Sequence, residues 1–317
     1  MRTIPIAAMA CAGALVLPAR ARGQEAHLEI LRQKFQDRIE AIADDFDGVA
    51  GIHVIDLDSG ARFGVNDDLV FPQGSAIKIP ILLELFRRAD HEPGLLRRRR
   101  EMTDDVRTGG SGVLRYLTGG GSALSLEDYA ITMILYSDNT ATNVLIDEMG
   151  MDSVNALMDH LGAPHTRLQR KMIRPEASAA GRENLSTPRE AADLMARIAR
   201  CDLPLGRPAC RRVTEILELY KGGPVRAPIP RTVKVAFKPG GIEGVATVWA
   251  MVELPDRPYI LTVMTNYGGD GSAAIRTASE AAYTYFTKLA RSTPYGARVP
   301  LAVKRRASGN RSPDPRP

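Results

Sequence analysis

A serine and a lysine stand three residues apart at Ser75 and Lys78, the combination of a nucleophile and a base. Residues three apart share one face of a helix, so the two side chains can hydrogen-bond if a helix starts at Ser75. A serine hydroxyl is a weak nucleophile and must lose its proton to a neighbour. Lys78 can take that proton only with a lowered pKa, which burial among the surrounding isoleucines and leucines favours. The alternative is an ordinary capped helix, because Ser-x-x-Lys is frequent by chance.

A second polar motif, Ser137-Asp138-Asn139, interrupts a predominantly apolar helical block. A break of this kind costs stability, so it is expected mainly where it serves a function. Its alternative interpretation is a turn between two helices, with Asp138 or Asn139 as the N-cap.

The third motif is Lys238-Pro239-Gly240-Gly241, which follows one predicted strand and precedes the next. Glycines in a strand let its backbone approach a ligand closely. A Pro-Gly turn carrying a surface lysine is the alternative interpretation.

The elements that must position these motifs follow from hydrophobic periodicity, with helices in the middle of the chain and strands at both ends. The pattern predicts strands over 49–57, 61–65, 232–237, 246–253 and 259–266. It predicts helices over 28–46, 75–89, 126–135, 140–149, 154–161, 191–199, 213–220 and 273–289, and an irregular stretch over 162–186. The simplest arrangement is a sheet assembled from both termini with a helical block inserted.

Together the three motifs resemble those of the serine β-lactamase and penicillin-binding-protein superfamily, most closely the class A β-lactamases. Ser137 follows Ser75 by 62 residues and Lys238 follows it by 163, near the class A spacings. The resemblance runs from about residue 51 to residue 289. It implies an α/β (α+β) domain over 22–295, with a five-stranded antiparallel sheet flanked by helices and an all-α part over about 75–225.

The resemblance also implies the acylation chemistry. Ser75 would attack the carbonyl carbon of the substrate, Lys78 would accept or relay the proton of Ser75, and Ser137 would pass a proton to the leaving nitrogen. By the same resemblance, the backbone N–H groups of Ser75 and Gly241 would form the oxyanion hole, and the loss of one such donor costs ~10²–10³ in rate.

Substrate binding is implied at three further positions. Asn139 would hold the substrate amide and orient Lys78, and Lys238 would meet the substrate carboxylate. Gly240 and Gly241 would bring the strand backbone against the ligand. Pro239 departs from the family, which has Thr or Ser there, and the missing hydroxyl puts high affinity for the usual drugs in doubt.

A second departure concerns release of the acyl group. Matching Arg170 to the arginine of the family loop puts Met172 where the family has the glutamate that activates the deacylating water, and a thioether cannot accept a proton. Our hypothesis is that Glu176 is a relocated base, with Glu183 as a weaker candidate. The alternative is that both are solvated loop carboxylates.

Three functions compete. The first is a β-lactamase with an acyl-enzyme on Ser75 and slow deacylation. The second is a serine hydrolase or peptidase acting on a peptidoglycan peptide, ester or amide, and the third is a non-catalytic penicillin-binding-like module. Because the serine, lysine and asparagine positions are intact, we predict the first, with a small-molecule β-lactam or peptidoglycan-derived substrate.

The N-terminus is typical of an export signal over residues 1–21: Met1-Arg2, an uncharged apolar run over 4–17, and Ala19-Arg20-Ala21 as a small-x-small cleavage site. The apolar run is too short for a membrane anchor, and lipidation at Cys11 is the alternative. We therefore expect a periplasmic or secreted protein that starts near Arg22 and is not an integral membrane protein.

The net charge and the cysteines bear on the partners and on metal binding. The net charge is +5, and the basic tail over 300–317 is rich in Ser, Pro and Arg and should be disordered. The chain lacks the interleaved aromatics of a nucleic-acid binder, so we expect a solvated basic face and no nucleic acid. We also expect a monomer. Cys201 and Cys210 either close a small loop or stay as two thiols. No Cys-His cluster has zinc-ligand spacing, so we expect no metal and no cofactor.

Overall fold

The computed structural model describes residues 19–118, 120–293 and 295–300. Most of the predicted export signal and of the predicted disordered tail lies outside these residues. The chain divides into two compact units, one of residues 1–34 with 292–317 and one of residues 35–291. In the first unit, the described part contains the beginning of helix α1 (Ala19–Asp44) and an isolated bridge between Ser292 and Arg298. The three motifs all lie in the second unit.

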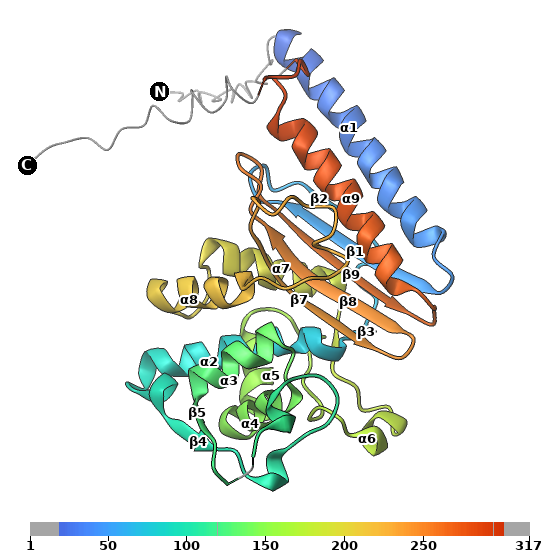
Figure 1. Cartoon of the computed structure of the whole chain (residues 1–317). Helices are drawn as coiled ribbons and strands as arrows, with labels where there is room; N and C mark the ends of the chain where they lie inside the picture. Colours follow the sequence, from blue (N-terminus) through green and yellow to red (C-terminus); the bar gives the residue numbers. More distant parts are fainter. Residues whose placement is uncertain (1–18, 119, 294, 301–317) are drawn as a thin grey trace, which may run out of the picture. The chain divides into compact units, whose positions relative to one another are not determined.

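A five-stranded antiparallel sheet in the order β2-β1-β9-β8-β7 forms the frame of the second unit (Figure 1). Its strands are β1 (Val49–Asp56), β2 (Arg62–Val65), β7 (Val235–Ile242), β8 (Val245–Val252) and β9 (Tyr259–Asn266). β1 from the N-terminal side pairs with β9 from the C-terminal side over their whole length, from Val49 with Asn266 to Asp56 with Tyr259. The predicted five-stranded sheet built from both ends of the chain is therefore confirmed.

Both faces of the sheet are covered, which explains why its central strands are almost continuously apolar. Helix α9 (Gly271–Ala290) packs against β8 and β9, and helix α7 (Pro188–Arg200) packs against β1, β8 and β9. On the α9 side, Phe286 stacks on Tyr259 with ring centroids 4.2 Å apart. On the α7 side, the Thr262 hydroxyl donates to the Pro188 carbonyl at 2.7 Å.

The remaining helices form the inserted block, with α2 at its centre (Figure 1). They are α2 (Lys78–His91), α3 (Leu126–Leu135), α4 (Asn139–Met149), α5 (Met151–His160), α6 (Pro175–Ala179) and α8 (Arg207–Glu218). Short 3₁₀ turns and two small sheets complete the chain: η1 (Gly74–Ile77), η2 (Leu95–Arg97), η3 (Asp104–Val106), η4 (Leu114–Tyr116), β3 (Phe71–Pro72) with β6 (Leu185–Ser186), and β4 (Arg99–Glu101) with β5 (Ala123–Ser125). α2 is buried from Lys78 to Phe86, as expected of the helix at the centre of the block.

Three sequence expectations need refinement. The helix expected from Ser75 starts as the 3₁₀ turn η1, and the α-helix begins only at Lys78. The stretch 162–186, expected to be irregular, contains α6 and β6. The strand expected to end at Phe237 continues to Ile242, straight through Pro239. Because β7 is an edge strand, a residue without an N–H is tolerated there.

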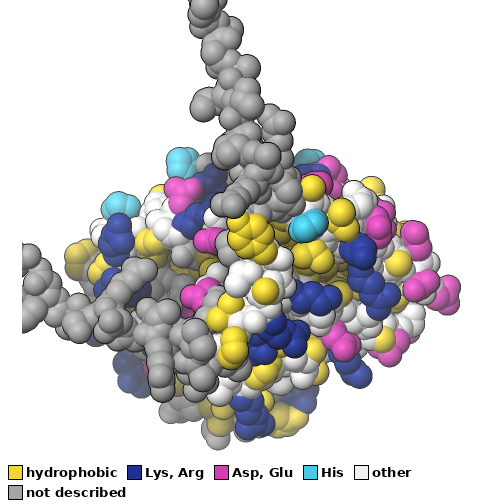
Figure 2. All heavy atoms as spheres, turned by 90° about the horizontal axis from the view of Figure 1, so that it is seen from above, with side chains coloured by type: hydrophobic (Ala, Val, Ile, Leu, Met, Phe, Trp, Pro, Cys, Tyr) yellow, Lys and Arg dark blue, Asp and Glu magenta, His cyan; other side chains and the backbone are white. Residues whose placement is uncertain are grey.

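Cys201 and Cys210 form a disulfide bond, so the open question about these two thiols resolves to the closed loop. The bond joins the end of α7 to α8. Over residues 19–118, 120–293 and 295–300, no helix is both long and apolar enough to cross a membrane. Figure 2 shows one face of the molecule, on which basic and acidic side chains are interspersed.

Candidate active site

Ser75 is positioned by a close backbone contact between the turn η1 and the edge strand β7. Gly74 has φ of 48°, and a Cβ there would lie 2.6 Å from the Gly241 nitrogen. On the strand, a Cβ at Gly240 would lie 2.2 Å from the Gln73 carbonyl oxygen. Only glycine fits either position, because no side chain can occupy the space between the two backbones. The contact brings the backbone of Gly241 beside the turn that carries Ser75.

Gln73, which the sequence analysis did not single out, anchors this turn. Its side chain is fully buried. Its Oε1 accepts a hydrogen bond from Trp249 Nε1 at 2.8 Å, and its backbone oxygen accepts one from the Thr247 hydroxyl at 2.9 Å. Both partners lie on β8, so the residue before Gly74 ties η1 to the strand beside the edge strand β7. An uncharged polar residue between an apolar strand and the Gly-Ser pair was the available signal.

Lys78 is the first residue of α2, and its side chain is fully buried. Its Nζ lies 2.7 Å from the Ser137 carbonyl oxygen, 3.1 Å from Ser137 Oγ and 3.0 Å from Asn139 Oδ1. Burial lowers the pKa of its ammonium group to about 7, and the nearby charge of Asp138 opposes this shift. Among the described residues the Ser75 hydroxyl has no hydrogen-bond partner, so the Ser75–Lys78 bond considered above is not formed here.

Ser137 connects the two lysines of the motifs. It has φ of 54°, a left-handed conformation that costs energy for any residue other than glycine. The turn directs both oxygens of Ser137 at Lys78, and its Oγ lies 3.0 Å from Lys238 Nζ as well. Lys238 is fully buried and also donates to the Pro239 carbonyl oxygen at 2.9 Å. Burial, with the nearby charges of Lys78 and Lys221, holds the pKa of Lys238 well below its usual value.

Asp138 and Asn139 organise the loop beside the site. Asp138 is the N-cap of α4, and its Oδ1 accepts from the Ala141 nitrogen, as the capping interpretation predicts. Its Oδ2 also accepts from the nitrogens of Val113 and Leu114 at 2.7 and 2.8 Å, a role that the sequence did not reveal. Asn139 accepts a hydrogen bond from Lys78 Nζ through its Oδ1 and donates from Nδ2 to the Gly109 carbonyl at 3.0 Å. The motif is thus both a helix start and part of the site.

A cavity of about 310 Å³ opens beside Ser75. The residues lining it are Gly74, Ser75, Gly110, Ser111, Asn139, Arg170, Met172, Ile173, Arg174, Pro175, Ser178, Asn184, Gly241 and Ile242. Within the described part of the chain, this lining includes no aspartate or glutamate. Such a cavity next to a nucleophile is a place for the acyl part of a substrate.

The loop opposite Ser75 carries the departures from the family pattern. Met172 lines the cavity and is buried, and its backbone is held by Asn143 through a 2.8 Å bond from the Met172 nitrogen to Oδ1. Glu176 is the second residue of α6, exposed and outside the lining. Glu183 is also outside the lining and pairs with Arg170 at 2.6 Å, with Ser178 as a further hydrogen-bond partner.

Comparisons with known proteins identify the family of the chain. A model of the beta-lactamase enzyme family matches residues 34–286. The chain belongs to this family. Beta-lactamase SME-1 of Serratia marcescens is 26% identical over 241 residues, which are 72% of this chain and 79% of that protein.

Solved structures extend the likeness to the whole fold. A class A beta-lactamase from Mycobacterium abscessus is 25% identical with a TM-score of 0.73, covering 80% of this chain and 99% of that one. A mutant of PBP-A, solved as an acyl-enzyme complex with penicillin G, is 29% identical with a TM-score of 0.73, covering 82% of this chain and 97% of that one. The predicted resemblance to the class A β-lactamases is confirmed.

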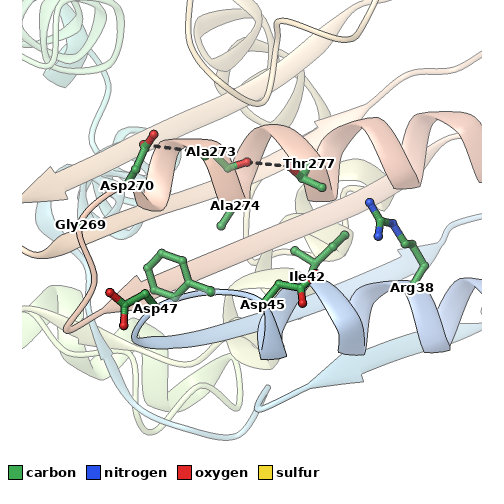
Figure 3. Close-up of a pocket in the computed structure, with 10 residues that line it drawn as sticks. Arg38, Ile42, Asp45, Asp47, Gly269, Asp270, Ala273, Ala274 and Thr277 are labelled. Carbon is green, nitrogen blue, oxygen red and sulfur yellow. Dashed lines mark hydrogen bonds between the residues drawn. The ribbon is translucent and has the colours of Figure 1, made fainter.

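A second cavity, of about 380 Å³, lies between the end of α1 and the start of α9 (Figure 3). Asp45, Asp47 and Asp270 lie along it, and Asp270 caps α9 by accepting from the Ala273 nitrogen at 3.1 Å. None of the motif residues lines this cavity. The chemistry of the family therefore belongs to the cavity beside Ser75.

Proposed function

We propose that the chain is a serine β-lactamase-type hydrolase that opens a cyclic amide through an acyl-enzyme on Ser75 and releases the acyl group slowly. The observation that carries the proposal is the position of Ser137 Oγ, within hydrogen-bond distance of both buried lysines. A proton path of this kind serves a reaction in which one group loses a proton and another gains it. The family supports the β-lactam as substrate.

The acylation half of the cycle follows from these groups. Lys78, whose pKa is about 7, is partly neutral at neutral pH and takes the Ser75 proton while Oγ attacks the carbonyl carbon. The oxygen–carbon bond forms, the carbon–nitrogen bond of the ring breaks, and the proton passes from Lys78 through Ser137 to the leaving nitrogen. The backbone N–H groups of Ser75 and Gly241 stabilise the negative oxygen, and Lys238 meets the substrate carboxylate.

The release half lacks an evident base. Met172 occupies the lining where the resemblance requires a glutamate. The described lining holds no carboxylate at all. Water in the acyl-enzyme would lose the general base catalysis that is typically worth ~10²–10⁴ in rate. The hypothesis that Glu176 replaces the base stays a prediction, and the exposed position of that side chain gives it no support.

The lack of a carboxylate in the described lining also favours a second candidate, a serine hydrolase or peptidase acting on a peptidoglycan peptide, ester or amide. A cavity without a base for water suits an acyl-enzyme that is resolved by another acceptor. Pro239, which offers no hydroxyl beside Lys238, also weakens recognition of the usual drugs.

Mass spectrometry of the intact protein after mixing with benzylpenicillin tests the proposal. We expect a covalent adduct of one drug molecule that persists for minutes, disappears in Ser75→Ala and remains in Ser111→Ala. Ser111 is a suitable control because it lines the same cavity. Its hydrogen bond, from the Asn139 nitrogen, uses the backbone carbonyl oxygen and not the side chain. An unmodified protein that consumes the drug would show fast release, and an untouched protein and drug would indicate a non-catalytic module.

Export to the periplasm or medium is part of the same proposal. The Cys201–Cys210 bond supports it, because disulfides persist in oxidising compartments. A mature N-terminus at Arg22, found by mass spectrometry of the protein expressed from its full sequence, is the expected result. A cytoplasmic protein that still starts at Met1 would contradict export.

A further inference from the structure

We propose that the cavity beside Ser75 selects acyl groups that carry a carboxylate, and that Arg174 is the residue that recognises it. This specificity rests on the proposed acylation of Ser75 and names the class of substrate for it. The carboxylate in question belongs to the acyl side of the substrate and is distinct from the one expected to meet Lys238.

The described lining of the cavity is basic. Two arginines, Arg170 and Arg174, line it together with Ser75, whereas the described lining has no acidic residue. Lys78 and Lys238 are not among the lining residues, so this space receives a different part of the substrate. Ile173 and Ile242 add apolar surface to the lining beside the arginines.

The two arginines are not equivalent. Arg170 is committed to Glu183, with Nη2 and Nε at 2.6 and 3.2 Å from the same carboxylate oxygen. Arg174 donates from Nη1 to the Ile173 carbonyl at 3.1 Å. Over the described residues, no carboxylate lies within ion-pair distance of Arg174. Its guanidinium therefore has donors left for a ligand, in a planar fork that matches a carboxylate.

The exposure of Arg174 sets the size of the effect. The side chain is exposed, so water and salt screen its charge and the gain per ion pair is small. A selectivity of about threefold to fivefold is expected, where fivefold corresponds to about 1 kcal/mol. Two kinds of acyl donor offer the required chemistry: a penicillin with an acidic side chain, and a linear peptide whose acyl part ends in a carboxylate.

Carbenicillin and benzylpenicillin give a direct test, because they differ by one carboxylate on the side chain. The measurement is the second-order rate constant for acylation of the full chain, taken for both drugs with the wild type and with Arg174→Gln. We expect Arg174→Gln to lower the rate constant for carbenicillin about threefold to fivefold, while that for benzylpenicillin changes less than twofold. The difference should shrink at high salt.

Arg182→Gln is the matched control, since Arg182 is an exposed arginine of the same loop outside the lining. It should change the acylation rate constant of neither drug. If the ratio of the acylation rate constants for the two drugs is the same in Arg174→Gln and Arg182→Gln, the proposed specificity is wrong while the acyl-enzyme proposal stands. If neither drug acylates Ser75 in the wild type, the proposed function falls, and the specificity falls with it.

A second pair of probes distinguishes the two sources of the carboxylate. D-alanyl thioesters capped with succinyl or with valeryl differ in the same way, and thiol release reports their turnover. A dependence on Arg174 for the succinyl probe as well as for carbenicillin assigns the subsite to acidic acyl groups of both kinds. A dependence confined to carbenicillin restricts it to β-lactams, and a dependence for neither overturns the proposal.

Discussion

At the scale of single residues, the site is defined by two lysine ammonium groups that meet at one serine hydroxyl. Ser137 Oγ lies 3.1 Å from Lys78 Nζ and 3.0 Å from Lys238 Nζ. Two like charges this close in a buried place cannot both be fully protonated without a large cost. Both lysines have a lowered pKa, which is about 7 for Lys78, three residues after the nucleophile. At Lys78 it is burial that lowers the pKa and so prepares this lysine to act as the base.

The pH dependence of acylation follows from this value. Lys78 acts only when neutral, and its pKa is about 7, so the acylation rate constant should rise with pH through that region and then level off. Stopped-flow measurement with a chromogenic cephalosporin between pH 5 and 9 checks this. A profile that is flat across neutrality, or one that falls, would exclude Lys78 as the proton acceptor.

Met172→Glu should supply the missing base. The side chain lines the cavity with Ser75, so a carboxylate there can reach water near the ester. We expect the acyl-enzyme lifetime to shorten by about 10²-fold, at the lower end of general base catalysis. Met172→Gln, of similar size and without a basic oxygen, should keep the long lifetime. Equal lifetimes for Glu and Gln would mean that release is limited by something other than a base.

At the scale of elements, the decisive contact is backbone against backbone, between η1 and β7. Gly240 sits where a Cβ would lie 2.2 Å from the Gln73 carbonyl oxygen and 2.6 Å from the Ala76 nitrogen. Neither atom belongs to a flexible side chain, so the strand or the turn would have to move. Because Ser75 and Gly241 lie on the two sides of this contact, the spacing of the proposed oxyanion hole depends on Gly240.

Gly240→Ala should therefore impair both stability and acylation. Overpacking of this kind costs ~1–3 kcal/mol, and a shift of about 1 Å in the reacting groups costs ~10² in rate. Gly241→Ala is the control for stability alone, because its nearest neighbour would be the Val245 carbonyl oxygen at 3.4 Å. Urea unfolding and the acylation rate measure the two effects. Unchanged values for Gly240→Ala would show that the two backbones are not tightly held.

Local patterns predicted most elements because each is apolar on the faces that it buries. The strand 259–266 was predicted with the bounds that the structure has. Sequence alone misjudged Pro239, since the tolerance for proline depends on β7 being an edge strand, which is a property of the assembled sheet. Gln73 was missed for a similar reason, because its partner Trp249 is far along the chain.

At the scale of the whole molecule, stability depends in part on one covalent link. The Cys201–Cys210 bond closes a loop with a sequence separation of 9 between α7 and α8. Cys201 also ends α7 in a left-handed conformation, with φ of 51°. Neither cysteine lines the cavity beside Ser75, so the bond supports the fold without taking part in the chemistry.

Replacing both cysteines by serine should lower the free energy of unfolding by ~2–3 kcal/mol, the entropy that a short closed loop removes from the unfolded chain. The acylation rate constant at 25 °C should stay within about twofold of the wild type. Urea unfolding of the wild type with and without a reductant, beside the double variant, measures the effect. Identical curves for all three samples would mean that the bond does not form in solution.

The pairing of β1 with β9 has a consequence for biogenesis. β1 occupies Val49–Asp56 and its central partner occupies Tyr259–Asn266, so the ribosome must add about 200 residues before the two can meet. At ~5–20 residues per second, this delay lasts roughly 10–40 s. During that interval the N-terminal strand has no central partner, and the nascent chain cannot complete its sheet. A chain of this topology stays available to a translocation channel for most of its synthesis.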